Sequence, residues 1–117
     1  MRGTAASALD GTLAALADPT RRRVVELLQR GPRRAGDLAA ASRVSAPAMS
    51  RHLRVLRQRG LVEEERAEAD ARVRVYRLRP KPFTDLQAWL HQIESFWTDQ
   101  LGAFKVHAER GRSGGER

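Results

Sequence analysis

Polar and basic side chains recur at helical spacing between residues 45 and 57, and they are suited to contact a polyanion. The set comprises Ser45, Ser50, Arg51, His52, Arg54 and Arg57. An arginine can donate a pair of hydrogen bonds to guanine or to a phosphate, and serine or histidine can reach base edges or phosphates. Ser50 and Arg51 are therefore the first candidates for base contacts, and Arg54 and Arg57 are better placed for the phosphate backbone.

The positive charge of the chain is concentrated in its first half. The 117 residues carry a formal net charge of +8, and residues 21–60 alone contain eleven arginines against two acids, a local balance of +9. Residues 83–109, in contrast, have a balance of −3. A solvated helix face usually mixes both signs, whereas no acid occurs between Asp37 and Glu63. The distribution favours polyanion binding by the first half over two alternatives, a solvated face and the Arg-rich composition of a GC-rich genome.

The segments that must position these residues show the periodicity of four consecutive helices, expected over about residues 9–17, 19–29, 35–41 and 46–59. Asp18 and Ser45 can cap the second and the fourth of them, and Gly31 and Gly60 can end them. A short helix, a tight turn at residues 42–45 and a longer helix have the dimensions of a helix-turn-helix, whose second helix can lie in a major groove. The inner edge of that fourth helix is predicted to consist of Met49, Leu53 and Leu56.

After the fourth helix the pattern changes from a helical period to a strand-like one. Residues 61–67 and 72–78 are predicted to form a β-hairpin, the wing, joined by the polar stretch 68–71. This stretch lacks Gly and Asn, so we expect a longer loop instead of a tight two-residue turn. Arg66, Arg72 and Arg74 of the hairpin are placed to reach phosphates or the minor groove beside the fourth helix.

A long amphipathic helix is predicted after Pro80 and Pro82, which we expect to break the chain. Thr84 and Gln87 match a capping box, so the helix should run from there to about residue 109. Its apolar band is longer than a small domain can cover, which favours packing between subunits over an apolar ligand pocket. The band comprises Leu86, Trp89, Leu90, Ile93, Phe96, Trp97, Leu101 and Phe104.

Together these elements predict a mainly α fold with a small β-hairpin, a winged helix-turn-helix of five helices in the order α-α-α-α-β-β-α. We expect one domain at residues 9–109 with disordered ends at residues 1–8 and 110–117. The chain contains no cysteine, no apolar stretch approaching the length of about 18 residues needed for a membrane span, and no signal-peptide pattern. These features predict a cytoplasmic location.

Two stretches of the chain closely resemble the ArsR/SmtB-type winged-helix repressors. They are residues 16–28, LADPTRRRVVELL, and residues 50–62, SRHLRVLRQRGLV, and the resemblance extends over about residues 9–105. It implies a homodimeric repressor that binds a palindromic operator in double-stranded DNA and releases it when an effector binds. In this family the first and last helices typically form the dimer. Here those helices would contribute Leu9, Leu13, Leu16, Trp89, Ile93, Phe96, Trp97, Leu101 and Phe104.

Many members of that family sense metals, and the sequence contains only part of such a site. The segment 35–41 offers no cysteine, and residues 79–81 are Arg-Pro-Lys where the family's last-helix site has Asp-x-His. His91 and Glu94 share a helix face, so a metal-responsive repressor using this pair remains an alternative. The chain looks most similar to the metal-free subset with a tryptophan-rich last helix. We therefore expect no metal and no cofactor, and the effector is left open.

Other functional classes fit the sequence less well. The three histidines are scattered, and no catalytic triad, carboxylate pair or Gly-rich phosphate loop is present, so an enzyme is not predicted. A winged-helix module that binds RNA or protein instead of an operator is a closer alternative. RNA readers usually stack aromatic side chains on bases, and the basic half contains no Phe, Trp or Tyr before Tyr76. The composition therefore favours duplex DNA.

Overall fold

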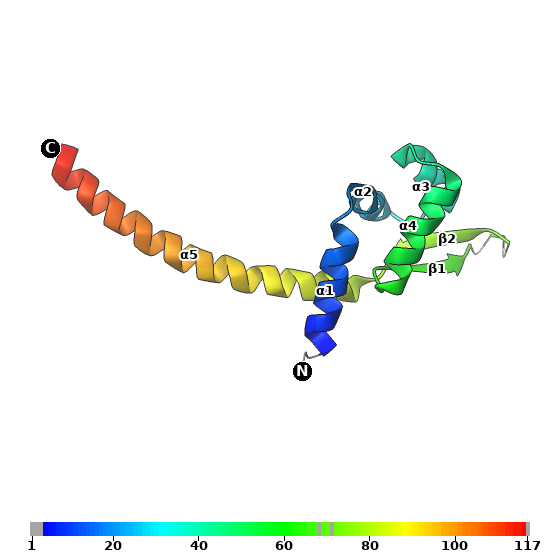
Figure 1. Ribbon diagram of the computed structural model, residues 1–117, viewed down its shortest axis with the longest axis horizontal. Coiled ribbons are helices and arrows are strands. Elements are labelled where there is room, and N and C mark those ends of the chain that lie inside the picture. The colour runs from blue at the N-terminus through cyan, green and yellow to red at the C-terminus, as the bar shows by residue number, and fades with distance from the viewer. Residues whose placement is uncertain (1–3, 68, 71, 117) are drawn as a thin grey trace. The chain divides into compact units, whose positions relative to one another are not determined.

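The computed structural model describes the backbone of residues 4–67, 69–70 and 72–116, and the side chains of residues 7–67, 69–70 and 72–102. Its helices are α1 (Thr4–Leu16), α2 (Pro19–Leu28), α3 (Ala35–Ser42), α4 (Ala46–Gln58) and α5 (Pro80–Glu116). Strands β1 (Val62–Arg66) and β2 (Arg74–Leu78) form an antiparallel hairpin between α4 and α5 (Figure 1). This order confirms the predicted winged helix-turn-helix. The chain divides into two compact units, residues 1–84 and residues 85–117.

The first unit is built around one apolar core to which α2, α3, α4 and β1 all contribute. Burying a large aliphatic side chain completely stabilises the fold by about 1.5–3 kcal/mol. The predicted inner edge of α4 is confirmed, and its outer side is thereby fixed toward solvent. The largest fully buried side chains are Val24, Leu38, Met49, Leu53, Leu56 and Leu61.

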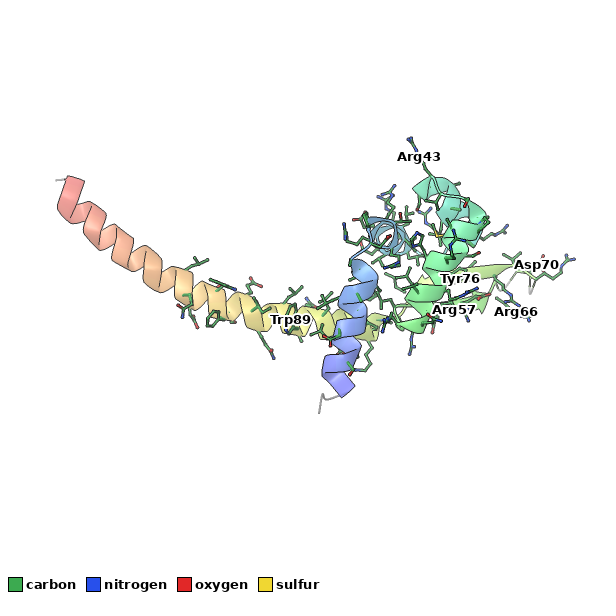
Figure 2. The ribbon with its side chains drawn as sticks, in the orientation of Figure 1. Arg43, Arg57, Arg66, Asp70, Tyr76 and Trp89 are labelled. Carbon is green, nitrogen blue, oxygen red and sulfur yellow. The ribbon has the colours of Figure 1, made fainter. Side chains whose placement is uncertain are left out.

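The turn between α3 and α4 is short and is defined at both ends by local backbone geometry. Arg43 ends α3 in the left-handed region at φ 57°, and its side chain points away from the helices (Figure 2). Ser45 begins α4 as predicted, because its Oγ accepts a hydrogen bond from the backbone N–H of Ala48 at 3.2 Å. Pro47 lies in the first turn, where a missing N–H costs no helical hydrogen bond. The start of α4 is therefore held by its own sequence.

The hairpin is attached to the loop that precedes α3. In its register Val62 faces Leu78 and Glu64 faces Tyr76. The backbone of Arg33 forms an isolated antiparallel bridge with Tyr76, with hydrogen bonds of 3.1 and 2.8 Å. Residue 33 thus pairs with the middle of β2 and anchors the wing. Such a pairing between distant parts of the chain leaves no local sequence pattern, and we did not predict it.

The predicted start of the last helix was wrong. Helix α5 begins at Pro80, four residues before the expected cap Thr84. The Thr84 hydroxyl donates to the carbonyl oxygen of Lys81 at 2.9 Å, inside the helix, and so caps nothing. Pro80 and Pro82 occupy the first turn, where the backbone N–H groups have no helical acceptor, so their rings do not break the helix.

Both outer helices are also longer than the sequence predicts. Helix α1 begins at Thr4 where Leu9 was expected, and α5 continues to Glu116 where about residue 109 was expected. Residues 4–8 and 110–116 therefore belong to these two helices, and the disorder expected at the ends stays a prediction. Extending a helix that has already formed adds one hydrogen bond for each residue ordered, which offsets poor local propensity. Over the described residues, no helix combines the length and the apolar character required to cross a bilayer.

Candidate nucleic-acid interface

The outer face of α4 presents three exposed polar or basic residues opposite its buried edge. Ser50, Arg51 and Arg54 are all exposed, while Met49 and Leu53 beside them are buried. Neither arginine has a hydrogen-bond or ion-pair partner among the described residues. Because the buried edge packs into the core, these side chains are carried on a rigid helix. Their guanidinium groups are available to an external anion.

The hydroxyl of Ser45 is partly committed to the helix. Its Oγ accepts the hydrogen bond from Ala48 that caps α4, so its role as a contact residue is limited to the remaining hydroxyl proton and lone pair. The side chain is exposed at the helix N-terminus, where the positive end of the helix dipole favours negative charge. Ser45 therefore both forms α4 and lies where a phosphate would be favoured.

His52 is a residue of α4 whose side chain reaches the start of α2, with only 22% of that side chain exposed. Its Nδ1 lies 3.4 Å from Arg21 Nη1 and 3.8 Å from Asp18 Oδ2. Asp18 in turn caps α2 by accepting from the Arg21 backbone N–H at 3.0 Å. That backbone hydrogen bond, with smaller contributions from the charges of His52 and Arg21, lowers the pKa of Asp18 below its ordinary value of 3.8. His52 is thus a link between two helices, in contrast to the freely exposed arginines.

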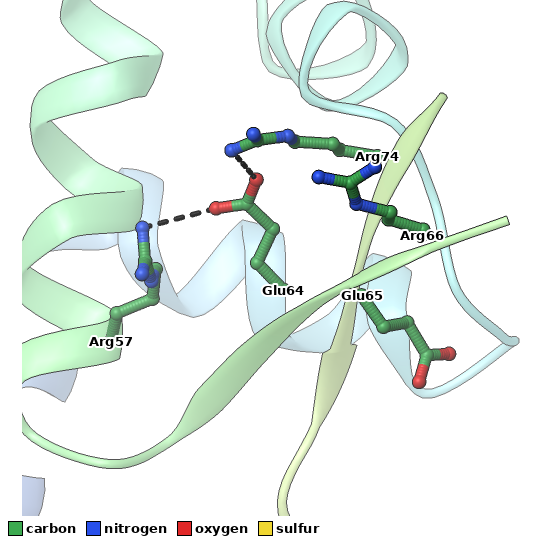
Figure 3. Close-up of a pocket in the computed structure, with 5 residues that line it drawn as sticks. All are labelled: Arg57, Glu64, Glu65, Arg66 and Arg74. Carbon is green, nitrogen blue, oxygen red and sulfur yellow. Dashed lines mark hydrogen bonds and ion pairs between the residues drawn. The ribbon is translucent and has the colours of Figure 1, made fainter. Parts of the chain in front are cut away.

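Arg57 and Arg74, both predicted to contact DNA, converge on one carboxylate in the structure. Glu64 Oε2 lies 3.0 Å from Arg57 Nη1, and Glu64 Oε1 lies 2.9 Å from Arg74 Nη1 (Figure 3). The hydroxyl of Tyr76 also lies near this carboxylate, 3.4 Å from Glu64 Oε2. Burial, and then the negative charge of Glu64, raise the pKa of Tyr76 above its ordinary value of 10.0. This cluster joins α4 to both strands of the wing.

A pocket of about 280 Å³ opens between α4 and the hairpin at this cluster. Arg66 and Arg72, the other two wing arginines expected to contact DNA, extend the positive charge along the hairpin. Arg66 faces Arg74 across the strands, and Arg72 is 92% exposed and pairs with Asp70 at 3.4 Å. The pocket is lined by Arg57, Glu64, Glu65, Arg66 and Arg74.

Sequence reasoning identified the arginines of this surface but missed the acid at its centre. Alternation along β1 places Glu64 on the same side as the buried Val62, and this pattern is the signal that could have identified it. Arg21 and Arg33 were also missed as contacts of α4 and of the wing. Their roles depend on neighbours that are distant in sequence.

The apolar residues expected at a subunit interface differ in exposure. Leu16 packs against the core of its own unit, Leu9 is half-buried, and Leu13 is exposed. On α5, Trp89 and Ile93 are half-buried, and the side chain of Phe104 lies outside the described residues. The exposed large apolar residues of α5 are Leu90, Phe96, Trp97 and Leu101.

Two neighbouring aromatic side chains on α5, Phe96 and Trp97, are exposed and pack against each other. The rings of Phe96 and Trp97 meet edge to face with centroids 5.6 Å apart and an interplanar angle of 82°. Trp97 remains 54% exposed. A contiguous set of large apolar side chains at the surface is typical of an interaction site.

His91 and Glu94 are both exposed on α5. In the described parts of the chain, no three or more His, Cys, Asp or Glu side chains come together in an arrangement that could hold a metal ion. His107, which the sequence places on the same helix, has its side chain outside the described residues.

Comparison with known proteins relates the first unit to one family. The family model "Bacterial regulatory protein, arsR family" matches residues 18–64, which include α2, α3 and α4. The HTH-type transcriptional regulator Rv2034 of Mycobacterium tuberculosis is 43% identical over 90 residues, 77% of this chain and 78% of that protein. The transcriptional repressor SdpR of Bacillus subtilis is 36% identical over 58 residues, half of this chain and 64% of that protein.

Solved structures show the same architecture. An ArsR-like transcriptional regulator from Rhodococcus sp. RHA1 superposes with a TM-score of 0.70 at 30% identity, covering 94% of this chain and 98% of that one. The homodimeric winged helix-turn-helix DNA-binding domain of Mb0332 from Mycobacterium bovis has a TM-score of 0.60 at 23% identity, covering 80% of this chain and 84% of that one. The second likeness concerns the fold alone.

Proposed function

Because the chain belongs to the ArsR family of bacterial transcriptional regulators, we propose that it is a homodimeric repressor that binds a palindromic operator in duplex DNA through α4. One observation carries the proposal. The outer face of α4 bears Ser50, Arg51 and Arg54 without an acid, on a helix whose other side is locked into the core. A helix of this kind fits the major groove, which is about 12 Å wide.

The roles of the three residues follow from their positions along α4. Ser50 and Arg51 lie in the N-terminal half of the helix and contact base edges, with Arg51 donating to guanine O6 and N7. Arg54 lies one turn further and contacts the phosphate backbone. Sequence preference should therefore depend on Ser50 and Arg51 more than on Arg54.

The wing contacts DNA beside the α4 groove. Arg72 is almost fully exposed near the end of the hairpin, and Arg66 and Arg74 face each other across it. Arginines at such positions reach phosphates or enter the minor groove. These contacts add affinity and register but little sequence information.

A dimer presents α4 twice. The exposed Leu13 on α1 and the exposed Phe96, Trp97 and Leu101 on α5 supply apolar surface for a second copy. A two-fold dimer matches an operator whose half-sites lie about 34 Å apart, one turn of the duplex. The repressor name of SdpR supports this direction of regulation. Since the operator is bacterial DNA, the protein would act in the cytoplasm.

The test is selection of duplexes from a random library by the purified protein, followed by binding measurements and sedimentation analysis. We expect a single preferred sequence with two-fold symmetry, bound by two copies of the chain. Sequence-independent binding at all salt concentrations, or tight operator binding by a single copy, would contradict the proposal.

A further inference from the structure

Glu64 occupies an unusual position for an acid, at the centre of a surface that otherwise gathers arginines. Only 13% of its side chain is exposed, and both of its oxygens are used. Oε1 pairs with Arg74 at 2.9 Å, and Oε2 pairs with Arg57 at 3.0 Å and lies 3.4 Å from the Tyr76 hydroxyl. A carboxylate shielded from water interacts more strongly with its partners than an exposed one.

The strand register explains why an acid is needed there. Arg66 and Arg74 lie directly opposite each other on one side of the hairpin, a like-charge pair that destabilises a sheet. Glu64 occupies the neighbouring position on the same side and draws the Arg74 guanidinium toward α4, while Arg66 lies beside it (Figure 3). Glu65, the next residue, points to the other side of the strand, as alternation requires (Figure 3).

We propose that Glu64 is a positioning residue of the DNA-binding surface, which holds Arg57 of α4 and Arg74 of β2 in one cluster and competes with phosphates for both. The inference rests on the proposed function. It assigns to Glu64 two effects, a fixed placement of the wing against α4 and a lower affinity for random duplex.

The lower affinity for random duplex follows from the free-energy cost of separating Arg57 and Arg74 from Glu64. If both arginines turned to phosphates, Glu64 would remain as a shielded carboxylate with the Tyr76 hydroxyl but without a positive partner, which is strongly unfavourable. On random DNA the two arginines therefore stay with Glu64, and fewer phosphates are contacted. Base contacts by α4 depend on the placement of the wing, so the preferred site loses nothing by this arrangement. Glu64 thus raises the ratio of specific to random affinity.

The experiment compares wild type with Glu64→Gln on the selected site and on a random duplex over a salt series. Each phosphate newly contacted should steepen the slope of log K against log salt by about 0.9, roughly a threefold change in affinity between 50 and 200 mM salt. We expect a steeper slope and tighter binding on random duplex, no gain on the selected site, and a lower specificity ratio. For one additional phosphate contact, the difference in specificity ratio between the two proteins should shrink about threefold from 50 to 200 mM salt. A wild-type slope and ratio in Glu64→Gln would overturn the inference.

Two further variants separate positioning from net charge and from misfolding. Glu63→Gln makes the same charge change at the adjacent residue, whose carboxylate pairs with Arg77 and so does not touch the cluster. Changes in Glu63→Gln equal to those in Glu64→Gln would mean that only net charge matters, and would overturn the inference. Glu64→Asp keeps the charge but withdraws the carboxylate by one C–C bond, and it should still lower the specificity ratio. It also replaces Glu64→Gln if that protein does not fold.

The same measurements distinguish this inference from the proposed function. A wild-type protein with no sequence preference would reject both. A wild-type protein with a preferred site, whose specificity ratio is unchanged by Glu64→Gln and Glu64→Asp, would reject only the role of Glu64.

Discussion

The backbones of Arg33 and Tyr76 exchange two hydrogen bonds, although 43 positions separate them: the N–H of Arg33 donates to the Tyr76 oxygen at 3.1 Å, and the N–H of Tyr76 donates to the Arg33 oxygen at 2.8 Å. The Tyr76 side chain meanwhile reaches Glu64, which pairs with Arg57 of α4. The loop before α3, the wing and α4 are therefore joined through one residue of β2. The placement of the wing depends on this connection.

Replacing Arg33 by proline should loosen the wing, because proline has no N–H to donate to Tyr76. We expect Arg33→Pro to lower the free energy of unfolding by about 1–3 kcal/mol in urea titrations. Arg34→Pro is the matched control. It makes the same charge change at a residue with φ −76°, which proline adopts, and should cost less than about 0.5 kcal/mol. Equal losses in both variants would show that the bridge is not the cause.

Removing the predicted base contacts should weaken operator binding selectively. Ser50→Ala and Arg51→Ala are each expected to cost about 1–3 kcal/mol on the selected operator and much less on random duplex, as measured by fluorescence anisotropy. Arg23→Ala removes the same charge from the outside of α2, where Arg23 lies near Glu26, and serves as control. A loss of the same size on both duplexes would show that Arg51 contacts phosphates instead of bases.

A charge within the apolar surface of α5 should dissociate the dimer. Trp97→Asp or Ile93→Asp would place a carboxylate among apolar side chains, and specific binding should be lost with the second half-site. Ser95→Asp adds the same charge on the opposite face of the helix and should remain dimeric. Sedimentation velocity reports the outcome. If the Trp97→Asp protein sediments like wild type, α5 is not part of the dimer interface.

The two candidate caps should behave differently when their hydroxyls are removed. Ser45→Ala deletes the cap of α4 and is expected to cost about 1 kcal/mol of stability. Thr84→Ala deletes a hydroxyl inside α5 and should change stability by at most a few tenths of a kcal/mol, since alanine is the better helix former. Thermal melts of both variants decide the point. A large loss of stability in Thr84→Ala would show that Thr84 does cap the helix.

Asp18 should contribute to the acid sensitivity of the fold. Its pKa is lowered in the folded state, so its contribution is present above the ordinary value of 3.8 and is lost as pH falls through the folded value. Asp18→Asn keeps a good N-cap but cannot titrate. Its stability should therefore fall less than that of wild type as the pH drops below about 4. Parallel pH–stability curves for the two proteins would exclude this role.

Part of the site was accessible from the sequence because its signals are local. The caps at Asp18 and Ser45 and the inner edge of α4 follow from residue types and from a 3.6-residue period. Competing local signals were harder to resolve. Thr84 and Gln87 matched a capping box, yet Pro80 began the helix earlier, because proline is also favoured at the first helical position.

The amino-acid sequence determined which segments are helical or extended, and it placed the positive charge on the outer side of one helix, since both depend on spacing along the chain. Tertiary structure decided what each charged group faces. It turned His52 toward Asp18 and joined Arg57 to Arg74 through Glu64. These contacts link side chains of different helices and strands, so they exist only after the core has brought α2, α4 and the wing together.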